Sequence, residues 1–145
     1  EDEEVSVVTN TTSNFRAQFD RVVSGDDIIE FQKVIRNVAV ADDVARYAVR
    51  LVAATRPAKP QAPDFIKKWV NWGAGLRASQ YLILGSKARA LMYGRFNISI
   101  SDIQALAMPV LRHRILTNFY AESEKIGSED IIRMLLETIE QPKGI

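Results

Sequence analysis

Apolar residues recur at helical spacing along most of the chain. Between 42 and 56 they fall at positions i, i+3, i+4, i+7 and i+8, with charged residues on the other faces. Such a stripe is typical of an amphipathic helix whose apolar face packs on a core. The stripe residues in this and three further segments are Val44, Tyr47, Ala48, Leu51 and Val52; Ile28, Phe31, Val34 and Ile35; Ile103, Leu106, Ala107, Val110 and Leu111; and Ile131, Ile132, Leu135, Leu136 and Ile139.

Serine residues mark the expected beginnings of three of these helices, because a serine side chain accepts hydrogen bonds from the free amides of a first turn. The expected caps are Ser24 with Asp27 before the helix that ends ahead of an extended link at 37–40, Ser99 or Ser101 before 102–111, and Ser128 before 129–139. Pro109 is expected to kink or end its helix.

The middle of the chain predicts two more helices. A short one over 64–72 places three aromatic residues on one side: Phe65, Trp69 and Trp72. The segment from 75 to 93 is apolar almost all round, so we expect a helix that is buried on most sides. Gly85 within it predicts a close neighbouring backbone, since glycine otherwise weakens a helix.

The chain shows no segment with the alternation of apolar and polar residues that a half-buried strand requires. The segment 96–101 is compatible with a few strand residues, but not with a sheet. Residues 1–14 predict the end of a short helix followed by a linker. We therefore expect an all-α fold, a helical bundle of five to seven helices.

Composition excludes several classes of function. Of the 145 residues 47% are hydrophobic, and 19 Lys and Arg nearly balance 18 Asp and Glu. A nucleic-acid surface needs a clear positive excess, so no nucleic-acid partner is expected. With no cysteine and with His113 as the single histidine, no metal site is expected. The longest apolar run, 81–84, is too short to span a membrane, and the acidic start is unlike a signal peptide. A cytoplasmic location is therefore expected.

The sequence contains no complete active-site motif. Its seven glycines form neither a Walker loop for phosphate nor a G-x-S-x-G elbow, and His113 has no partner spaced for a catalytic triad. The acidic pairs at 26–27, 42–43 and 129–130 fall in expected first helical turns, where capping and the helix dipole account for them.

One position does indicate a ligand. Arg77 follows Gly73 and Gly75 and falls in the first turn of the helix expected over 75–93. A cation there opposes the helix dipole, whereas an anion held by the free amides and the guanidinium is stabilised. The commoner interpretation is a surface arginine beside a glycine-rich turn. The functional interpretation is a phosphate contact, with the two glycines allowing close approach.

Longer stretches around Arg77 carry a family resemblance. "WGAGLRASQYLILGSKARAL", followed by "ISISDIQALAMPVLRHRI", resembles the C-terminal lid of MoxR-family AAA+ ATPases, and "SGDDIIEFQKVIRNVAVADDVARYAVRLVAATR" is similar to the first part of that lid. The resemblance covers roughly residues 20–140. It implies that residues 1–20 are the tail of a preceding AAA+ core with a linker, and that 21–145 form the helical lid domain.

The resemblance also implies a role for Arg77. The arginine of the family's Gly-Ala-x-x-Arg-Ala motif is the sensor 2 residue, and it falls on Arg77 here. Arg77 would then be a catalytic and ATP-binding residue that reaches the γ-phosphate, with Gly73 and Gly75 beside the nucleotide. Leu76 stands where the family usually has proline, a residue that suits the first helical position. The replacement of proline by leucine leaves the arginine in place.

The parent enzyme implied by the resemblance binds ATP and Mg through a core that this chain lacks. Its partners would be its own core, neighbouring subunits of a ring and, as candidate substrates of chaperone-like remodelling, von Willebrand A-domain proteins. Whether Arg77 serves its own subunit's nucleotide or a neighbour's is open. This chain alone is not expected to hydrolyse ATP, because it lacks the Walker lysine, the Mg ligands and the base.

Two alternative functions stand beside this interpretation, and two basic clusters have interpretations of their own. The chain could be a stand-alone helical interaction module that recognises a partner helix near Trp69 and Trp72, whereas a nucleic-acid-binding bundle is disfavoured by the charge balance. The basic cluster of Arg112, His113 and Arg114 is interpreted first as cations at a helix C-terminus, with a subunit or phosphate contact as the alternative. The pair at 55–56 is likewise interpreted as a helix C-terminal cap.

Overall fold

The computed structural model describes residues 1–14 and 19–142. The chain divides into two compact units, Glu1–Phe31 and Gln32–Ile145. The first unit holds helix α1 (Asp2–Thr11) and the first half of α2 (Gly25–Arg36), which ends in the second unit. The expected short helix near the start is therefore confirmed. The division at 20 between core tail and lid stays a prediction.

The cap expected at the start of α2 is also confirmed. The Ser24 N–H donates to Asp27 Oδ2 at 2.7 Å, and the Asp27 N–H donates back to Ser24 Oγ at 3.1 Å. The apolar stripe of α2 is, however, not part of a core, because no residue of α2 is buried. Ile28, Phe31 and Val34 are each at least 45% exposed.

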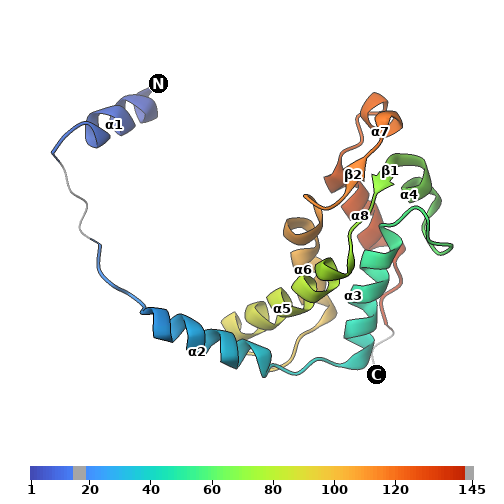
Figure 1. Cartoon of the computed structure of the whole chain (residues 1–145), viewed down its shortest axis with the longest axis horizontal. Coiled ribbons are helices and arrows are strands. Elements are labelled where there is room, and N and C mark those ends of the chain that lie inside the picture. The colour runs from blue at the N-terminus through green and yellow to red at the C-terminus, as the bar shows by residue number, and fades with distance from the viewer. Residues whose placement is uncertain (15–18, 143–145) are drawn as a thin grey trace. The chain divides into compact units, whose positions relative to one another are not determined.

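The second unit contains most of the helices (Figure 1). These are α3 (Asp42–Ala54), α4 (Asp64–Trp69), α5 (Leu76–Met92), α6 (Ile100–Leu111), α7 (Phe119–Ser123) and α8 (Ser128–Thr138). A two-stranded antiparallel sheet pairs β1 (Val70–Trp72) with β2 (Leu116–Thr117), and it lies with α4 and α7 at one end of the unit (Figure 1). The described residues thus form eight helices, two of them with only six and five residues, which confirms the all-α class.

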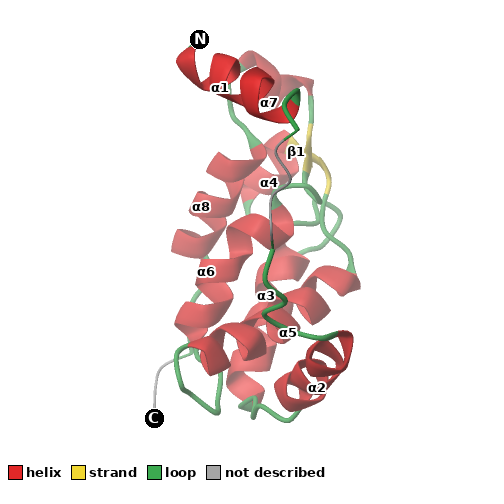
Figure 2. Ribbon diagram, turned by 90° about the vertical axis from the view of Figure 1, so that its left-hand side faces the viewer, coloured by secondary structure: helices red, strands yellow, loops and turns green. Residues whose placement is uncertain are grey.

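The core lies between α3, α5, α6 and α8. Helix α5 packs against α3 and α6, and α6 packs against α8 (Figure 2). The largest fully buried apolar side chains are Tyr47, Leu51, Ile66, Leu82, Ile103, Leu111, Ile131, Ile132 and Leu135. The stripes predicted for α3, α6 and α8 therefore do face the core. No helix in the described part of the chain is both long and apolar enough to cross a membrane.

The short helix expected over 64–72 is wrong in its last third. Helix α4 ends at Trp69, and the next three residues form β1. Asn118 accounts for this break, because its side-chain amide donates to the Lys68 carbonyl at 2.7 Å and its N–H donates to the Trp69 carbonyl at 2.9 Å. Trp72 consequently lies on the strand with its side chain 71% exposed, not on the face shared by Phe65 and Trp69. The few strand residues considered for 96–101 amount to one bridge, Asn97 with Ala39.

Helix α5 is buried on one side, not on most sides as its composition predicted. Leu82 and Ala90 are fully buried, whereas Tyr81 is 49% and Leu84 37% exposed. At Gly85 the neighbour is a side chain and not a backbone, since an added Cβ would lie 2.8 Å from Leu106 Cδ1 of α6. Glycine here lets a leucine of α6 fill the space beside α5.

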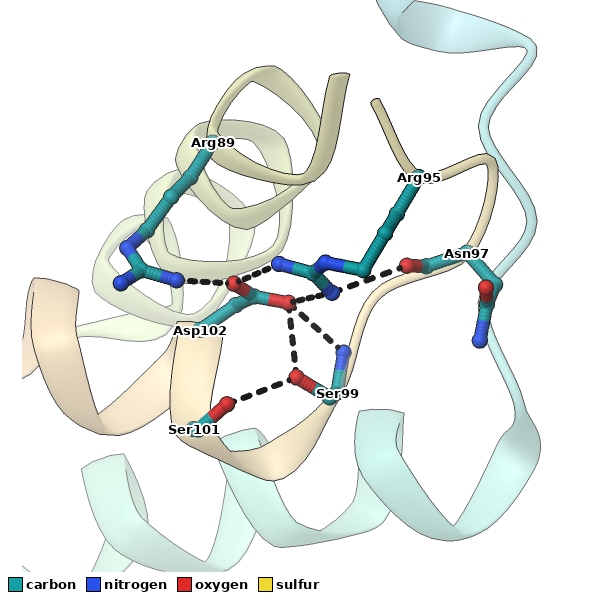
Figure 3. A network of polar contacts seen from close by, with 6 residues as sticks. All are labelled: Arg89, Arg95, Asn97, Ser99, Ser101 and Asp102. Carbon is teal, nitrogen blue, oxygen red and sulfur yellow. Dashed lines mark hydrogen bonds and ion pairs between the residues drawn. The ribbon is translucent and has the colours of Figure 1, made fainter. Parts of the chain in front are cut away.

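The C-terminal end of α5 is tied to α6 through one buried carboxylate (Figure 3). Asp102 is 0% exposed, and it accepts two hydrogen bonds from the Arg95 guanidinium, at 2.8 and 2.7 Å, and a further one from Arg89 of α5. It also accepts hydrogen bonds from the Ser99 N–H at 2.9 Å and from Ser99 Oγ at 2.8 Å. Ser99, not Ser101, is therefore the cap of α6.

Other helix boundaries differ slightly from those expected. Pro109 lies inside α6, which ends two residues later at Leu111. The cap of α8 is Gly127 instead of Ser128, with the Gly127 N–H donating to Asp130 Oδ2 at 2.9 Å. An aspartate in the third helical position can take the exposed amide from any residue type, so a serine is not required there.

Replacing Ser86 by alanine is expected to stabilise the chain by about 1 kcal/mol. Ser86 is fully buried in α5, and its Oγ has no hydrogen-bond partner among the described residues. Removal of the hydroxyl removes an unsatisfied polar group, and alanine has the higher helix propensity. Urea unfolding of the two proteins measures the difference. A lower midpoint for Ser86→Ala would mean that the hydroxyl has a partner, such as an internal water.

Candidate anion-binding site at the start of α5

Arg77 lies in the first turn of α5, as the sequence predicts. The helix begins at Leu76, and Gly75 precedes it as an extended N-cap residue with φ −83°. No side chain caps this N-terminus, and its first turn has no acidic residue. The Ala78 N–H donates to the Gly75 carbonyl at 3.0 Å, but the Leu76 and Arg77 amides have no hydrogen-bond partner among the described residues, so these two can meet an anion. Leu76 occupies the first helical position, where a proline also fits.

The Arg77 side chain is exposed and unengaged. Among the described residues, none forms a hydrogen bond or ion pair with its guanidinium. Two other exposed arginines of the unit have acidic partners: Arg46 pairs with Asp42 at 2.6 Å and Arg133 with Asp130 at 2.7 Å. Arg77 is thus placed as a phosphate contact requires, facing outward and without a competing carboxylate.

A groove of about 660 Å³ lies beside Arg77, between α5 and the α3 residues Ala45 and Val49. Three cations line it, Arg77, Lys87 and Arg36, and no acidic residue does. Lys87 Nζ donates to the Arg36 carbonyl at 2.9 Å, which fixes one wall. The remaining lining residues are mainly apolar, among them Tyr81 and Leu84. Such a surface suits a ligand with negative charge and an apolar part.

The two glycines before Arg77 have different surroundings. A Cβ on Gly73 would lie 2.2 Å from the Thr55 carbonyl oxygen at the end of α3, so only glycine allows this approach. Nothing lies within 4 Å of a Cβ on Gly75. The structure therefore explains Gly73 by the chain's own packing, and Gly75 is the position of the two that leaves room for another molecule.

Sequence reasoning missed the part that Thr55 and Arg56 play beside this site. Thr55 does act as the expected helix end, with Oγ1 donating to the Val52 carbonyl at 2.7 Å. The same Oγ1 accepts a hydrogen bond from the Ala74 N–H at 2.9 Å, and Arg56 Nε donates to the Ala74 carbonyl at 2.8 Å. A threonine and an arginine directly after an amphipathic helix carry no sequence signal for a partner 19 and 18 residues away, respectively.

Within the basic cluster at 112–114, Arg114 interacts with the C-terminal end of α6, as expected for a cation at a helix end. Its guanidinium donates to the Val110 carbonyl in the last turn of α6 and lies over the Tyr81 ring, 5.2 Å from the centroid. Arg114 also contacts His113 and lines a second groove of about 610 Å³ that shares Tyr81 with the first. Arg112 and His113 are exposed.

The Trp69 region is engaged within the chain. Trp69 Nε1 donates to Glu124 at 3.0 Å, and Lys68 pairs with the same carboxylate at 2.8 Å while lying 4.9 Å from the Trp69 ring centroid. The Lys68 ammonium holds the pKa of Glu124 below its usual range. These contacts give Trp69 a packing role within the chain.

Comparison with known proteins agrees with the resemblance found in the sequence. Residues 66–135 match the family described as AAA lid domain. Chaperone MoxR1 of Mycobacterium tuberculosis is 31% identical over 126 residues, which are 87% of this chain and 33% of that protein. The uncharacterised protein YeaC of Bacillus subtilis is 31% identical over 121 residues, 83% of this chain and 35% of that protein.

A solved structure shows the same fold. The crystal structure of a candidate ATPase from Cytophaga hutchinsonii superposes with a TM-score of 0.82 at 30% identity, over 99% of this chain and 44% of that one. The present chain thus spans about a third of the length of the curated relatives it matches.

Proposed function

Since the chain carries a C-terminal AAA lid domain of the MoxR type, we propose that it senses ATP for a ring-forming cytoplasmic ATPase. In this proposal Arg77 contacts the γ-phosphate of an ATP bound with Mg by a core outside this chain. The lid then couples hydrolysis to chaperone-like remodelling of partner proteins, for which von Willebrand A-domain proteins are the candidates.

The single observation that carries this proposal is the state of the Arg77 guanidinium. It is exposed at an uncapped helix N-terminus, and no described residue pairs with it. A cation opposes the dipole at this end of a helix, so nothing in the stability of the chain favours it. A triphosphate supplies the missing negative charge and can accept hydrogen bonds from the guanidinium and from the free amides.

The chain's own residues fit a nucleotide phosphate in two further respects. The groove beside Arg77 is lined by cations without a carboxylate, so it does not repel a polyanion. Gly75 leaves open space at the helix start, so an oxygen can approach the amides. When bound, ATP and Mg supply the phosphoryl group and its charge neutralisation; the chain supplies a positioned guanidinium.

Replacing Arg77 by alanine in the complete ATPase is expected to lower kcat/KM for ATP by about 10- to 100-fold, the range for losing one charge-assisted contact. Thermal unfolding of the isolated 145-residue chain is expected to show an unchanged or slightly raised midpoint, because a cation leaves the positive end of a helix. Arg133→Ala, which removes an exposed arginine of α8, is the matched control. Unchanged ATP turnover in Arg77→Ala would overturn the proposal.

A second candidate function is favoured by one observation. Trp72 and Leu116 face each other across the two strands, and their side chains are 71% and 60% exposed. An exposed apolar pair of this kind is a feature of interaction modules. An interaction module without a nucleotide role predicts normal turnover in Arg77→Ala and loss of partner binding in Trp72→Ala.

A further inference from the structure

The loop that leads into α5 is held at one residue by two consecutive side chains. Ala74 is 1% exposed, and both of its backbone polar groups have side-chain partners. Its N–H donates to Thr55 Oγ1 at 2.9 Å, and its carbonyl accepts from Arg56 Nε at 2.8 Å. Thr55 itself is 0% exposed and donates onward to the Val52 carbonyl of α3 at 2.7 Å. The side chains of Thr55 and Arg56 therefore satisfy both the N–H and the carbonyl of Ala74, which precedes the first residue of α5.

Gly73 makes the contact close. Its Cα carries no side chain, and a Cβ there would lie 2.2 Å from the Thr55 carbonyl oxygen and 2.8 Å from the Arg56 nitrogen. The backbone of the loop therefore rests directly on the backbone at the end of α3. The start of α5 is fixed relative to α3 by backbone packing and by two hydrogen bonds, and Arg77 follows Ala74 by three residues.

We propose that Thr55 and Arg56 are positioning residues for Arg77: they hold the loop at Ala74 so that the guanidinium meets its phosphate in a fixed place. This inference rests on the proposed ATP-sensing function. Contacts to a reacting phosphate must be placed within about 0.5 Å, and a displacement of about 1 Å can lower a rate about 100-fold. An exposed arginine cannot reach that accuracy through its own contacts, since no described residue holds its side chain.

The geometric part of the inference is tested on the isolated chain by hydrogen exchange of the Ala74 amide. Thr55→Val keeps the size of the buried side chain but removes its acceptor, so the protection of this amide is expected to fall about tenfold or more. Thr55→Ser keeps the hydroxyl and is expected to keep most of the protection. Unchanged protection in Thr55→Val would overturn the inference, because Ala74 would then not depend on the hydroxyl.

The functional part is tested by a double-mutant cycle in the complete ATPase. Arg56→Met is expected to lower kcat/KM for ATP about tenfold when Arg77 is present, and to have little further effect in the Arg77→Ala background. Arg46→Met, an exposed arginine of α3 with no contact to the loop, is the matched control and is expected to change neither background.

The outcomes separate this inference from the function on which it rests. If Arg77→Ala leaves turnover unchanged, both are overturned. If Arg77→Ala lowers turnover but Arg56→Met does not, the ATP-sensing function stands and the positioning role is overturned. If Arg56→Met lowers turnover equally with and without Arg77, its effect does not pass through Arg77, and the positioning role is again overturned.

Discussion

Replacing Asp102 by asparagine is expected to destabilise the chain by about 3 kcal/mol, the lower part of the range for breaking a buried ion pair. The carboxylate is fully buried, whereas the side chains of Arg89 and Arg95 are 30% and 36% exposed and keep some contact with water. Asparagine offers one oxygen where the two guanidinium groups and Ser99 now share two. Urea unfolding at neutral pH measures the loss.

The same substitution is expected to change the response to acid. Hydrogen bonds from Arg95 above all, and then from Ser99 and Arg89, hold the pKa of Asp102 far below its ordinary value of 3.8, against the effect of burial. A carboxylate whose pKa is lower in the folded state contributes stability that is complete above its unfolded pKa and is lost as the pH falls below it. The difference between wild type and Asp102→Asn should therefore be constant from about pH 5 upward and shrink below about pH 4.

Asp42→Asn is the matched control for this experiment. It makes the same change in an ion pair whose side chains, Asp42 and Arg46, are 80% and 73% exposed. Exposed pairs contribute little to stability, so the unfolding midpoint should move much less than in Asp102→Asn. Two results would contradict this role of Asp102 in tying α5 to α6. One is an equal loss of stability in both variants; the other is a stability difference between wild type and Asp102→Asn that does not shrink in acid.

Replacing Gly73 by alanine is expected to destabilise the chain by about 2–4 kcal/mol. The added Cβ would lie 2.2, 2.5 and 2.8 Å from three backbone atoms of Thr55 and Arg56. Backbone atoms cannot rotate away as a flexible side chain can, so the loop must lift from the end of α3. The two hydrogen bonds to Ala74 are expected to break with it.

Gly75→Ala provides the comparison for Gly73→Ala, two residues away. Nothing lies within 4 Å of its Cβ, and its φ of −83° is open to any residue. Its unfolding free energy should change by less than about 1 kcal/mol, the effect of a poorer N-cap residue. If Gly75→Ala were as destabilising as Gly73→Ala, the close approach at Thr55 would not be the cause.

Periodicity predicted the helices that bury a stripe within this chain. The stripes of α3, α6 and α8 face the core. The stripe of α2 has the same spacing, yet none of its residues is buried. Spacing identifies which face of a helix is apolar, but it does not say whether the surface that covers this face belongs to the same chain.

Features that depend on distant partners were not predictable. Strand β1 has three residues and forms because β2 and Asn118, far along the chain, take its hydrogen bonds and those of the preceding helix end. The position of Arg77 in a first turn could be predicted, because helix start signals are local. The support of its loop by Thr55 and Arg56 could not, because the partner of both side chains is the backbone of Ala74, which leaves no pattern in the sequence.

Helix α5 is fastened at both of its ends, to α3 through the loop at Ala74 and to α6 through Asp102. Its 17 residues form a helix about 25 Å long between these two points of attachment. A force on the first turn is therefore transmitted directly along the helix to its C-terminal end. Helix α5 should therefore move as a rigid body with α3 and α6. A small displacement at its N-terminus then becomes a displacement of all three helices.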